Sequence, residues 1–524
     1  MRSALLNLSL EEPSVSNPVI PGDHPDPTIL RVGQRYFASA TSGEWSPQFP
    51  LFESPDLTHW SMTGAIFPIQ PAWAEGSFWA PELVHDGKQF LAYYVARARG
   101  GPLSIAVATA ASPRGPWTDH GPILAEPLGS IDPAFARDEH GDPFLIWKTD
   151  GNSEQKPTPI WAQPLTPDLL HLTGTPTQLI TNDEPWEGGV VEGPYILRHE
   201  GRFYLFYAAN ACCGRECQYA EGVARADRLL GPWEKNPANP IIADNHGWRC
   251  PGHGTIVHGH TAPGETYQDY LLYHAYPREG TIYIGREAVL DQIAWSPDGW
   301  PTINAGQGPN ERGLDRLAPV DFEDNFESRT LAPSWQWPVN TYPTITTGHG
   351  ELHLTIPANR QSAMIAVPAP AIPGYTATVS LCTAAEPSVV LSSDSAQPDT
   401  PTYNPPPETT WSGLSIVGDP FNTIGLGLRR GDLELWQRKG DTSQIVWSQP
   451  IDRPETPLWL RVFSSGDLKL DFSWSHDQQT WSKAGDTIDA SDLPAWDRGL
   501  RIGLMIEGPG RGTVTFRHFL LKAG

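Results

Sequence analysis

The sequence predicts an all-β protein in which a five-bladed β-propeller is followed by a β-sandwich. Three observations lead to this fold class. One short phrase recurs five times in the first three hundred residues, and after residue 320 the pattern changes to short strands in which apolar and polar residues alternate. In addition, 54 Pro and 49 Gly interrupt the 524-residue chain too often for long helices.

The recurring phrase places a polar or aromatic residue next to Pro or Gly at the start of a strand. Its five copies are Asp26-Pro27-Thr28, Ala80-Pro81-Glu82, Asp132-Pro133-Ala134, Glu192-Gly193-Pro194 and Pro251-Gly252-His253. In the first four copies a glycine turn and an aromatic strand follow, which is typical of a β-hairpin. The copies are spaced by roughly 50 to 60 residues, a period expected of propeller blades.

The change of pattern divides the chain into two domains. We expect the propeller over residues 15–303 and a linker over 304–320, where Gly, Pro, Asn and charged residues show little periodicity. Strictly alternating segments such as 351–356 and 468–474 predict a concanavalin-like β-sandwich over residues 321–524.

Composition excludes several classes of function. A formal net charge of −24 disfavours nucleic acid, which requires a basic face. The 21 Trp and 15 Tyr suit a sugar ligand, although most of them are expected in the core. No apolar run is long enough to span a membrane, and residues 1–16 lack a secretory h-region. The expected location is therefore the cytoplasm, or outside the cell if a leader is missing from this chain.

The five cysteines are Cys212, Cys213, Cys217, Cys250 and Cys382. An odd count without framework spacing favours reduced thiols. A local disulfide is the first alternative. A zinc cluster is the second, although adjacent cysteines fit tetrahedral ligation poorly.

Because the inner strands of a propeller start at one mouth of the central channel, equivalent residues of the copies should converge. The sequence thus predicts Asp26, Asp132 and Glu192 around one pocket, with His253 near its floor. The acids could be simple turn formers. However, three repelling carboxylates are better explained by acid–base chemistry, and two carboxyls of unlike pKa are what glycoside hydrolysis requires.

The chain also resembles glycoside hydrolase family 43. The resemblance is carried by residues 17–27 (NPVIPGDHPDP), Trp79-Ala80-Pro81-Glu82, the Asp132 and Glu192 phrases, Gly252-His253-Gly254 and Gly285-Arg286-Glu287. It implies a five-bladed propeller and an inverting reaction. In that reaction Asp26 is the general base, Asp132 the pKa modulator and Glu192 the general acid.

Five further residues are expected at the site, and some of them could instead have a purely structural role. Trp79 and Glu82 of the second copy should hold the sugar, unless the tryptophan is core. By resemblance, Arg286 binds a hydroxyl or a carboxylate, unless it forms a surface ion pair, and Trp45 lies in a loop that closes the pocket. His253 would contact the substrate or, through water, a structural calcium ion, unless it is a hydrogen-bonded core histidine. No cofactor is required.

The expected function is that of an inverting exo-glycosidase that releases terminal xylose or arabinofuranose from hemicellulose-derived oligosaccharides. The alternatives are an endo-arabinanase or a galactosidase of the same fold, and a non-catalytic carbohydrate-binding propeller. The C-terminal sandwich is expected to brace the propeller, because its alternating strands show no obvious row of exposed aromatic residues.

Overall fold

The structure is a computed structural model of the chain. It describes residues 15–262, 264–279, 284–314, 321–370, 374–382, 410–419, 421–451, 457–466, 468–491, 493, 499–509 and 511–523. Within these ranges nearly all regular structure is β-strand, and helical structure is confined to short 3-10 turns such as Asn152–Glu154, Pro185–Glu187 and Asn304–Gly306. No helix in the described part of the chain has the length and hydropathy needed to cross a membrane.

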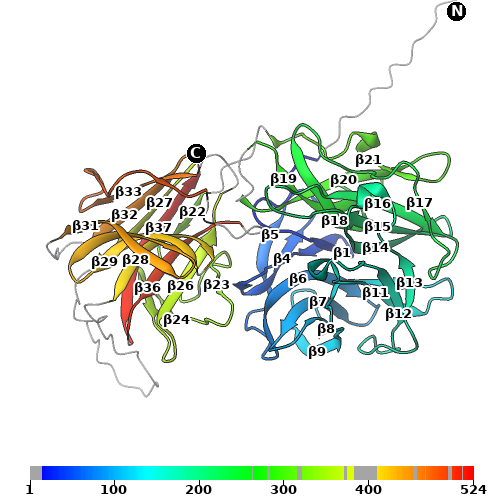
Figure 1. The fold of residues 1–524 in the computed structure, drawn as a ribbon, viewed down its shortest axis with the longest axis horizontal. Coiled ribbons are helices and arrows are strands. Elements are labelled where there is room, and N and C mark those ends of the chain that lie inside the picture. The colour runs from blue at the N-terminus through cyan, green and yellow to red at the C-terminus, as the bar shows by residue number, and fades with distance from the viewer. Residues whose placement is uncertain are drawn as a thin grey trace, which may run out of the picture.

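The N-terminal body consists of five four-stranded antiparallel sheets, coloured blue to green in Figure 1. Blade 1 contains β1 (Thr28–Val32), β2 (Arg35–Ser39), β4 (Gln48–Ser54) and β5 (Ser61–Phe67). Blade 2 contains β6 (Ala74–His85), β7 (Phe90–Ala98), β8 (Leu103–Ala110) and β9 (Thr118–Leu124). Blade 3 contains β10 (Ser130–Arg137), β11 (Pro143–Thr149), β12 (Ile160–Pro164) and β13 (Thr177–Ile180).

The remaining blades follow the same plan. Blade 4 contains β14 (Val191–His199), β15 (Arg202–Ala209), β16 (Ala220–Ala226) and β17 (Glu234–Lys235). Blade 5 contains β18 (Trp248–Gly259), β19 (Gln268–Pro277), β20 (Glu287–Trp295) and β21 (Pro301–Ile303). The first strand of each blade contacts the first strand of the next, and β18 contacts β1, so the ring closes. The predicted five-bladed propeller is therefore confirmed.

The repeated phrase encodes a kink in the backbone of each inner strand. Asp26, Ala80, Asp132, Gly193 and His253 all have a positive φ, between 44° and 57°. In β6, β10, β14 and β18 the pairing with the second strand shifts beside these residues, as at a β-bulge. A non-glycine residue in this conformation is strained by about 1 to 3 kcal/mol, and such strain concentrates at functional sites.

This register corrects the expected alignment of the three acids. The fourth copy places Gly193, not Glu192, at the kink occupied elsewhere by Asp26 and Asp132. The reason is steric, because a Cβ on Gly193 would lie 2.7 Å from the ring of His253. The acid of this copy therefore stands one residue earlier, at the position that Trp79 holds in the second copy.

The C-terminal body is a sandwich of two antiparallel sheets, coloured lime to red in Figure 1. One sheet contains β22 (Phe322–Asp324), β24 (Thr344–Gly348), β25 (Glu351–Thr355), β27 (Tyr375–Leu381), β32 (Leu458–Ser464), β33 (Lys469–Ser475), β34 (Ser482–Lys483), β35 (Ile488–Asp489) and β37 (Thr513–Ala523). The other contains β26 (Ser362–Pro368), β28 (Trp411–Asp419), β29 (Asn422–Arg429), β30 (Asp432–Lys439), β31 (Thr442–Pro450) and β36 (Arg501–Glu507). The inward residues of the alternating strands, such as Leu352 and Leu354, form one buried core, which confirms the predicted sandwich.

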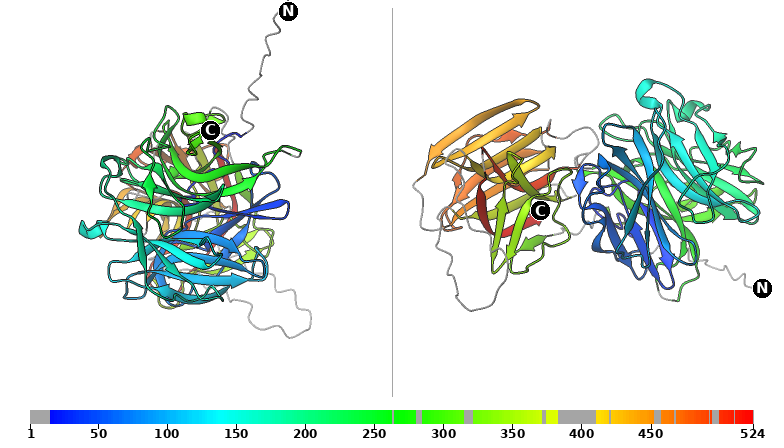
Figure 2. Two further views of the ribbon diagram at one scale, coloured as in Figure 1. Left: turned by 90° about the vertical axis from the view of Figure 1, so that its right-hand side faces the viewer. Right: turned by 90° about the horizontal axis from the view of Figure 1, so that it is seen from below.

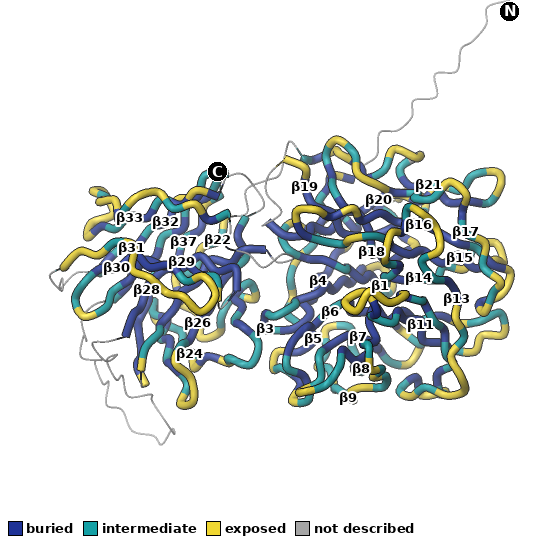
Figure 3. Tube along the Cα trace, in the orientation of Figure 1, coloured by how far each residue is buried: buried dark blue, intermediate teal, exposed yellow. Residues whose placement is uncertain are grey.

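The two bodies meet on the side of blade 1, as Figure 2 shows. Strand β3 (Trp45–Ser46) of the propeller pairs with β23 (Trp337–Pro338) of the C-terminal body. The Trp45 side chain is buried among sandwich residues that include Met364, Trp411 and Trp436. Figure 3 shows buried segments through the interior of both bodies, with exposed residues mainly on the loops.

Part of the predicted linker lies against the propeller. The Asn310 side chain donates to the Val15 carbonyl, and the backbone carbonyl of Asn310 accepts from the Trp248 indole. Residues 315–320 of the predicted linker lie outside the described ranges. The domain boundaries at 303 and 321 stay a prediction.

Candidate active site

A cavity of about 340 Å³ lies at the mouth where the inner strands of the propeller begin. Its wall brings together seven of the residues expected at the site: Asp26, Trp45, Trp79, Asp132, Glu192, His253 and Arg286. These residues come from the inner strands of all five blades or the residues just before them, from β3 and from the β19–β20 connection. Residues separated by more than two hundred positions thus share one small space.

The surroundings of Asp26 keep its side chain ionised. Its Oδ2 accepts a hydrogen bond of 2.7 Å from the Thr41 hydroxyl, and its Oδ1 lies 3.3 Å from Nη1 of Arg286 and 3.4 Å from Nδ1 of His253. Burial alone would raise the pKa of Asp26. The charges of Arg286 and His253 outweigh burial, and they hold this pKa well below its usual range. An ionised carboxylate beside a cavity can accept a proton from a bound water.

Asp132 has the opposite electrostatic setting. Its Oδ2 accepts the backbone N–H of Gly193 at 2.9 Å, and the side chain is almost fully buried. Burial and, to a smaller extent, the nearby charges of Glu192 and Asp26 raise the pKa of Asp132 to about 6, against the lowering effects of His253 and Lys148. The pKa of Asp132 is therefore higher than that of Asp26, although both carboxyls face the same cavity.

Both oxygens of the Glu192 carboxylate accept hydrogen bonds. Oε1 receives the Tyr219 hydroxyl at 2.8 Å and Oε2 receives Nζ of Lys148 at 2.8 Å. Burial would raise the pKa of Glu192, but the charge of Lys148 and these hydrogen bonds lower it. Of the two neighbouring carboxyls, Asp132 thus holds its proton more tightly than Glu192.

Two histidines complete the surroundings of Asp26. His274 is buried, which lowers its pKa to about 4, so the ring is neutral and its Nδ1 accepts the backbone N–H of Asp26 at 3.1 Å. The backbone of His253 is held in place by a hydrogen bond, because its N–H donates to the buried Glu221 carboxylate at 3.0 Å.

These residues offer little support for a calcium site. Calcium takes six to eight oxygen ligands. Near His253 the Glu221 carboxylate contributes one oxygen that has no hydrogen-bond partner, and burial raises the pKa of this group to about 8. The described residues include no cluster of three or more His, Cys, Asp or Glu arranged to hold a metal ion. Calcium at the axis stays a prediction from the resemblance.

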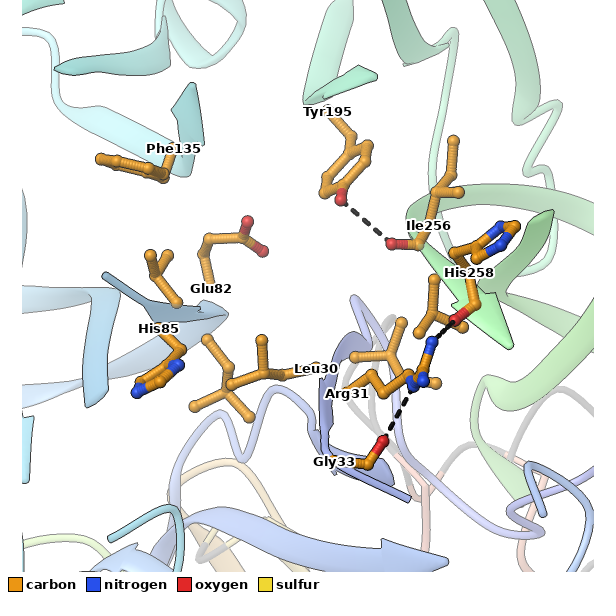
Figure 4. Close-up of a pocket in the computed structure, with 13 residues that line it drawn as sticks. Leu30, Arg31, Gly33, Glu82, His85, Phe135, Tyr195, Ile256 and His258 are labelled. Carbon is orange, nitrogen blue, oxygen red and sulfur yellow. Dashed lines mark hydrogen bonds between the residues drawn. The ribbon is translucent and has the colours of Figure 1, made fainter. Parts of the chain in front are cut away.

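Glu82 does not lie in this cavity, so its expected role in holding the sugar has to be corrected. It lines a second cavity, of about 550 Å³, shown in Figure 4. The inner strands contribute Ile29, Glu82, Phe135, Tyr195 and Ile256 to it, each three positions after the corresponding residue at the first cavity. Three residues of strand correspond to about 10 Å. Burial raises the pKa of Glu82 to about 8, and its Oε2 accepts the Thr28 hydroxyl at 3.0 Å.

The expectation of reduced thiols is wrong for four of the five cysteines. Cys212 is bonded to Cys213, and Cys217 to Cys250. These bonds realise the alternative of a local disulfide, and they leave no thiolate of these four cysteines for a zinc cluster. Cys212 and Cys213 line the cavity, so the segment after β15 forms part of the wall.

Four residues that contact the acids lie outside the repeated phrase and were not expected at the site: Thr41, Lys148, Tyr219 and His274. Lys148, for example, ends the apolar run of β11 and is completely buried. The position of Lys148 at the end of an apolar run was the one feature of the sequence that could have indicated its role. This feature becomes informative only when the carboxylates that face Lys148 are known.

A five-bladed propeller with three carboxyl groups of unlike pKa at one mouth defines a class of protein, the propeller hydrolases that cleave glycosidic bonds. The comparison with family models makes the assignment specific. The model of glycosyl hydrolases family 43 matches residues 15–301, and the chain belongs to this family.

Individual relatives are distant. The chain is 27% identical over 358 residues to a putative beta-xylosidase of Escherichia coli, covering 62% of this chain and 64% of that protein. It is 28% identical over 378 residues to a non-reducing end alpha-L-arabinofuranosidase of Bacteroides ovatus, covering 67% and 66%. The matches thus span less than two thirds of either relative.

A solved structure extends the similarity to the whole chain. A variant of the GH43 protein BlXynB of Bacillus licheniformis superposes with a TM-score of 0.78 at 21% identity, covering 97% of this chain and 99% of that one. At this identity the match supports the shared two-domain fold alone.

Proposed function

We propose that the chain is an inverting exo-glycosidase that releases terminal xylose or arabinofuranose from hemicellulose-derived oligosaccharides. The observation that carries this proposal is the convergence of Asp26, Asp132 and Glu192 on one cavity, with the pKa of Asp26 held low, as a base requires. The inverting reaction also needs a second carboxyl as proton donor, and Glu192, beside the like charge of Asp132, takes this role.

In the proposed reaction, the Asp26 carboxylate takes a proton from water while the water oxygen bonds to the anomeric carbon. The bond from that carbon to the leaving oxygen breaks, and this oxygen receives a proton from Glu192. Each turnover therefore leaves Asp26 protonated and Glu192 ionised, and exchange with solvent restores both. Asp132 raises the proton affinity of Glu192 through its own charge when it is ionised, and it fixes the backbone beside Glu192 through Gly193.

The size of the cavity supports exo action. Its volume of about 340 Å³ is near the lower end for small-molecule sites. Cys212, Cys213 and the segment with the buried Trp45 form part of its wall. Trp79 offers an aromatic face for a sugar ring, and Arg286 offers a charged donor beside Asp26. The printed names of the relatives, a beta-xylosidase and an arabinofuranosidase, fit either sugar.

An assay of wild type and Glu192→Gln on aryl β-xyloside, aryl α-L-arabinofuranoside, xylobiose, arabinobiose and linear arabinan tests the proposal. We expect activity on one or both aryl glycosides and the matching disaccharide, little on internal bonds of arabinan, and a loss of at least 100-fold for Glu192→Gln on the disaccharide. Release of internal arabinan fragments would indicate an endo-arabinanase, and binding without hydrolysis a carbohydrate-binding propeller.

The anomer of the first product, followed by NMR, tests the mechanism independently. An inverted product is expected. Initial retention of configuration would exclude Asp26 as the base that activates water.

A further inference from the structure

Lys148 is a charged side chain that faces the candidate acid from the second strand of blade 3. Its side chain is completely buried, and the residue lines the cavity. Nζ lies 2.8 Å from Oε2 of Glu192, 3.2 Å from Oδ1 of Asp150 and 2.9 Å from Oδ1 of Asn152. An ammonium group has three N–H donors, so these three acceptors use its full capacity and fix its position.

The charge on Lys148 does not depend on Glu192 alone. Burial would lower the pKa of Lys148, but the charges of Glu192, Asp150 and Asp132 raise it above its usual value. Asp150 keeps an opposite charge beside the amine even when Glu192 is protonated. The lysine therefore presents a fixed positive charge to Glu192 throughout a reaction cycle.

Such a charge acts differently on the two states of the acid. Protonated Glu192 is neutral and interacts with the ammonium weakly, whereas the carboxylate that remains after proton donation is an anion 2.8 Å from it, in a buried site. Interactions that strengthen as the reaction proceeds are those that accelerate it. The Tyr219 hydroxyl at Oε1 adds a second donor for the same anion.

On these grounds we propose that Lys148 is a positioning residue for leaving-group protonation: it holds the Glu192 carboxyl and stabilises the carboxylate that forms as the proton passes to the glycosidic oxygen. This inference rests on the proposed function. The alternative is that Lys148 only stabilises the fold around Asp150 and Asn152, in which case its loss would affect all substrates to the same extent.

The dependence of activity on the leaving group distinguishes a positioning role of Lys148 from a purely structural role. Wild type, Lys148→Met and Glu192→Gln are compared on the preferred disaccharide, whose leaving group requires a proton, and on the 2,4-dinitrophenyl glycoside of the same sugar, whose leaving group does not. For Lys148→Met we expect kcat to fall 10- to 100-fold on the disaccharide and less than 5-fold on the dinitrophenyl glycoside. Glu192→Gln should show the same selectivity to a greater degree.

Lys235→Met is the matched control. Lys235 is also largely buried and bonded to carboxylates, at 2.6 Å from Glu187 and close to Asp183, but it belongs to blade 4 and does not line the cavity. Its substitution should change stability without any leaving-group dependence. If Lys148→Met does not fold, Lys148→Gln replaces it, since the amide retains a donor but lacks the charge.

The outcomes distinguish the two proposals. Equal losses on both substrates for the Lys148 variant, with selective loss for Glu192→Gln, would overturn the role of Lys148 and leave the proposed function intact. No selectivity for Glu192→Gln would overturn the acid assignment, and a wild-type chain without glycosidase activity would overturn both.

Discussion

Arg501 of the sandwich forms an ion pair with Asp23 of the propeller, 478 positions away in sequence, with 3.2 Å between Nη2 and Oδ2. Asp23 lines the cavity, and the Arg501 guanidinium also lies 5.3 Å from the centre of the Trp45 ring, another wall residue. The same arginine donates to the Gln336 side chain at 2.9 Å. The sandwich thus fixes part of the cavity wall, in agreement with the expected bracing role.

Replacing Arg501 with Leu should therefore weaken substrate binding although no acid is touched. We expect KM to rise about 5- to 20-fold with a smaller change in kcat, because the wall carrying Asp23 and Trp45 is released. Steady-state kinetics with the aryl glycoside measures this. Arg517→Leu is the control, since Arg517 pairs with Glu351 within the sandwich. Equal effects of both variants would show that general destabilisation, and not the wall, is responsible.

Asp132→Asn should abolish activity and yet stabilise the protein at neutral pH. The folded pKa of Asp132, about 6, lies above the unfolded value of about 3.9, so the folded state binds this proton more tightly. Stability from this group is thus present below pH 4 and is lost as pH rises from about 4 to 6. Asn carries no charge to bury and retains an oxygen for the Gly193 N–H.

The expected gain for Asp132→Asn is about 3 kcal/mol in unfolding free energy at pH 7 and near zero at pH 4. Urea denaturation at both pH values measures it, with Asp142→Asn, an exposed residue of the same blade, as the control. A gain of equal size at both pH values would mean that ionisation of Asp132 is not its cause.

The bond between Cys217 and Cys250 should stabilise the cavity wall. It closes a loop with a sequence separation of 33, for which the chain-entropy model predicts about 3 to 4 kcal/mol. We expect Cys217→Ala/Cys250→Ala to lower the melting temperature and to raise KM, because Cys212 and Cys213 line the cavity in the segment that this bond secures. Calorimetry and kinetics measure both effects. Cys382→Ser, which removes a cysteine outside both disulfides, should change neither.

Glu82→Gln should leave kcat/KM within about 3-fold of wild type. With a pKa of about 8 this carboxyl is neutral at pH 7, so Gln is close to isosteric with it, and it faces the second cavity. Trp79→Ala, from the same strand but at the first cavity, should lower kcat/KM at least 10-fold. A large loss for Glu82→Gln would restore the sugar-binding role first expected for it.

The repeated phrase allowed the propeller, its number of blades and the convergence of Asp26, Asp132, Glu192 and His253 on one cavity to be predicted, because hairpins and kinks are encoded within a few residues. The alignment of Pro194 with the prolines of the earlier copies places Gly193 at the kink of the fourth blade. The phrase could not reveal the steric reason, which is the ring of His253 from the next blade. It also could not place Glu82, since a strand positions side chains by steps of about 3.3 Å and not by the phrase to which they belong.

By itself, the sequence determined the all-β class, the order of the two folds and the three acids, since each follows from a local and repeated pattern. The tertiary structure alone decided which protonation state each acid favours and which residues hold it. Lys148, Tyr219, His274 and Arg501 approach the wall from other strands, blades or the sandwich, and the electrostatic forces that set a pKa depend on distance in space, not on separation along the chain.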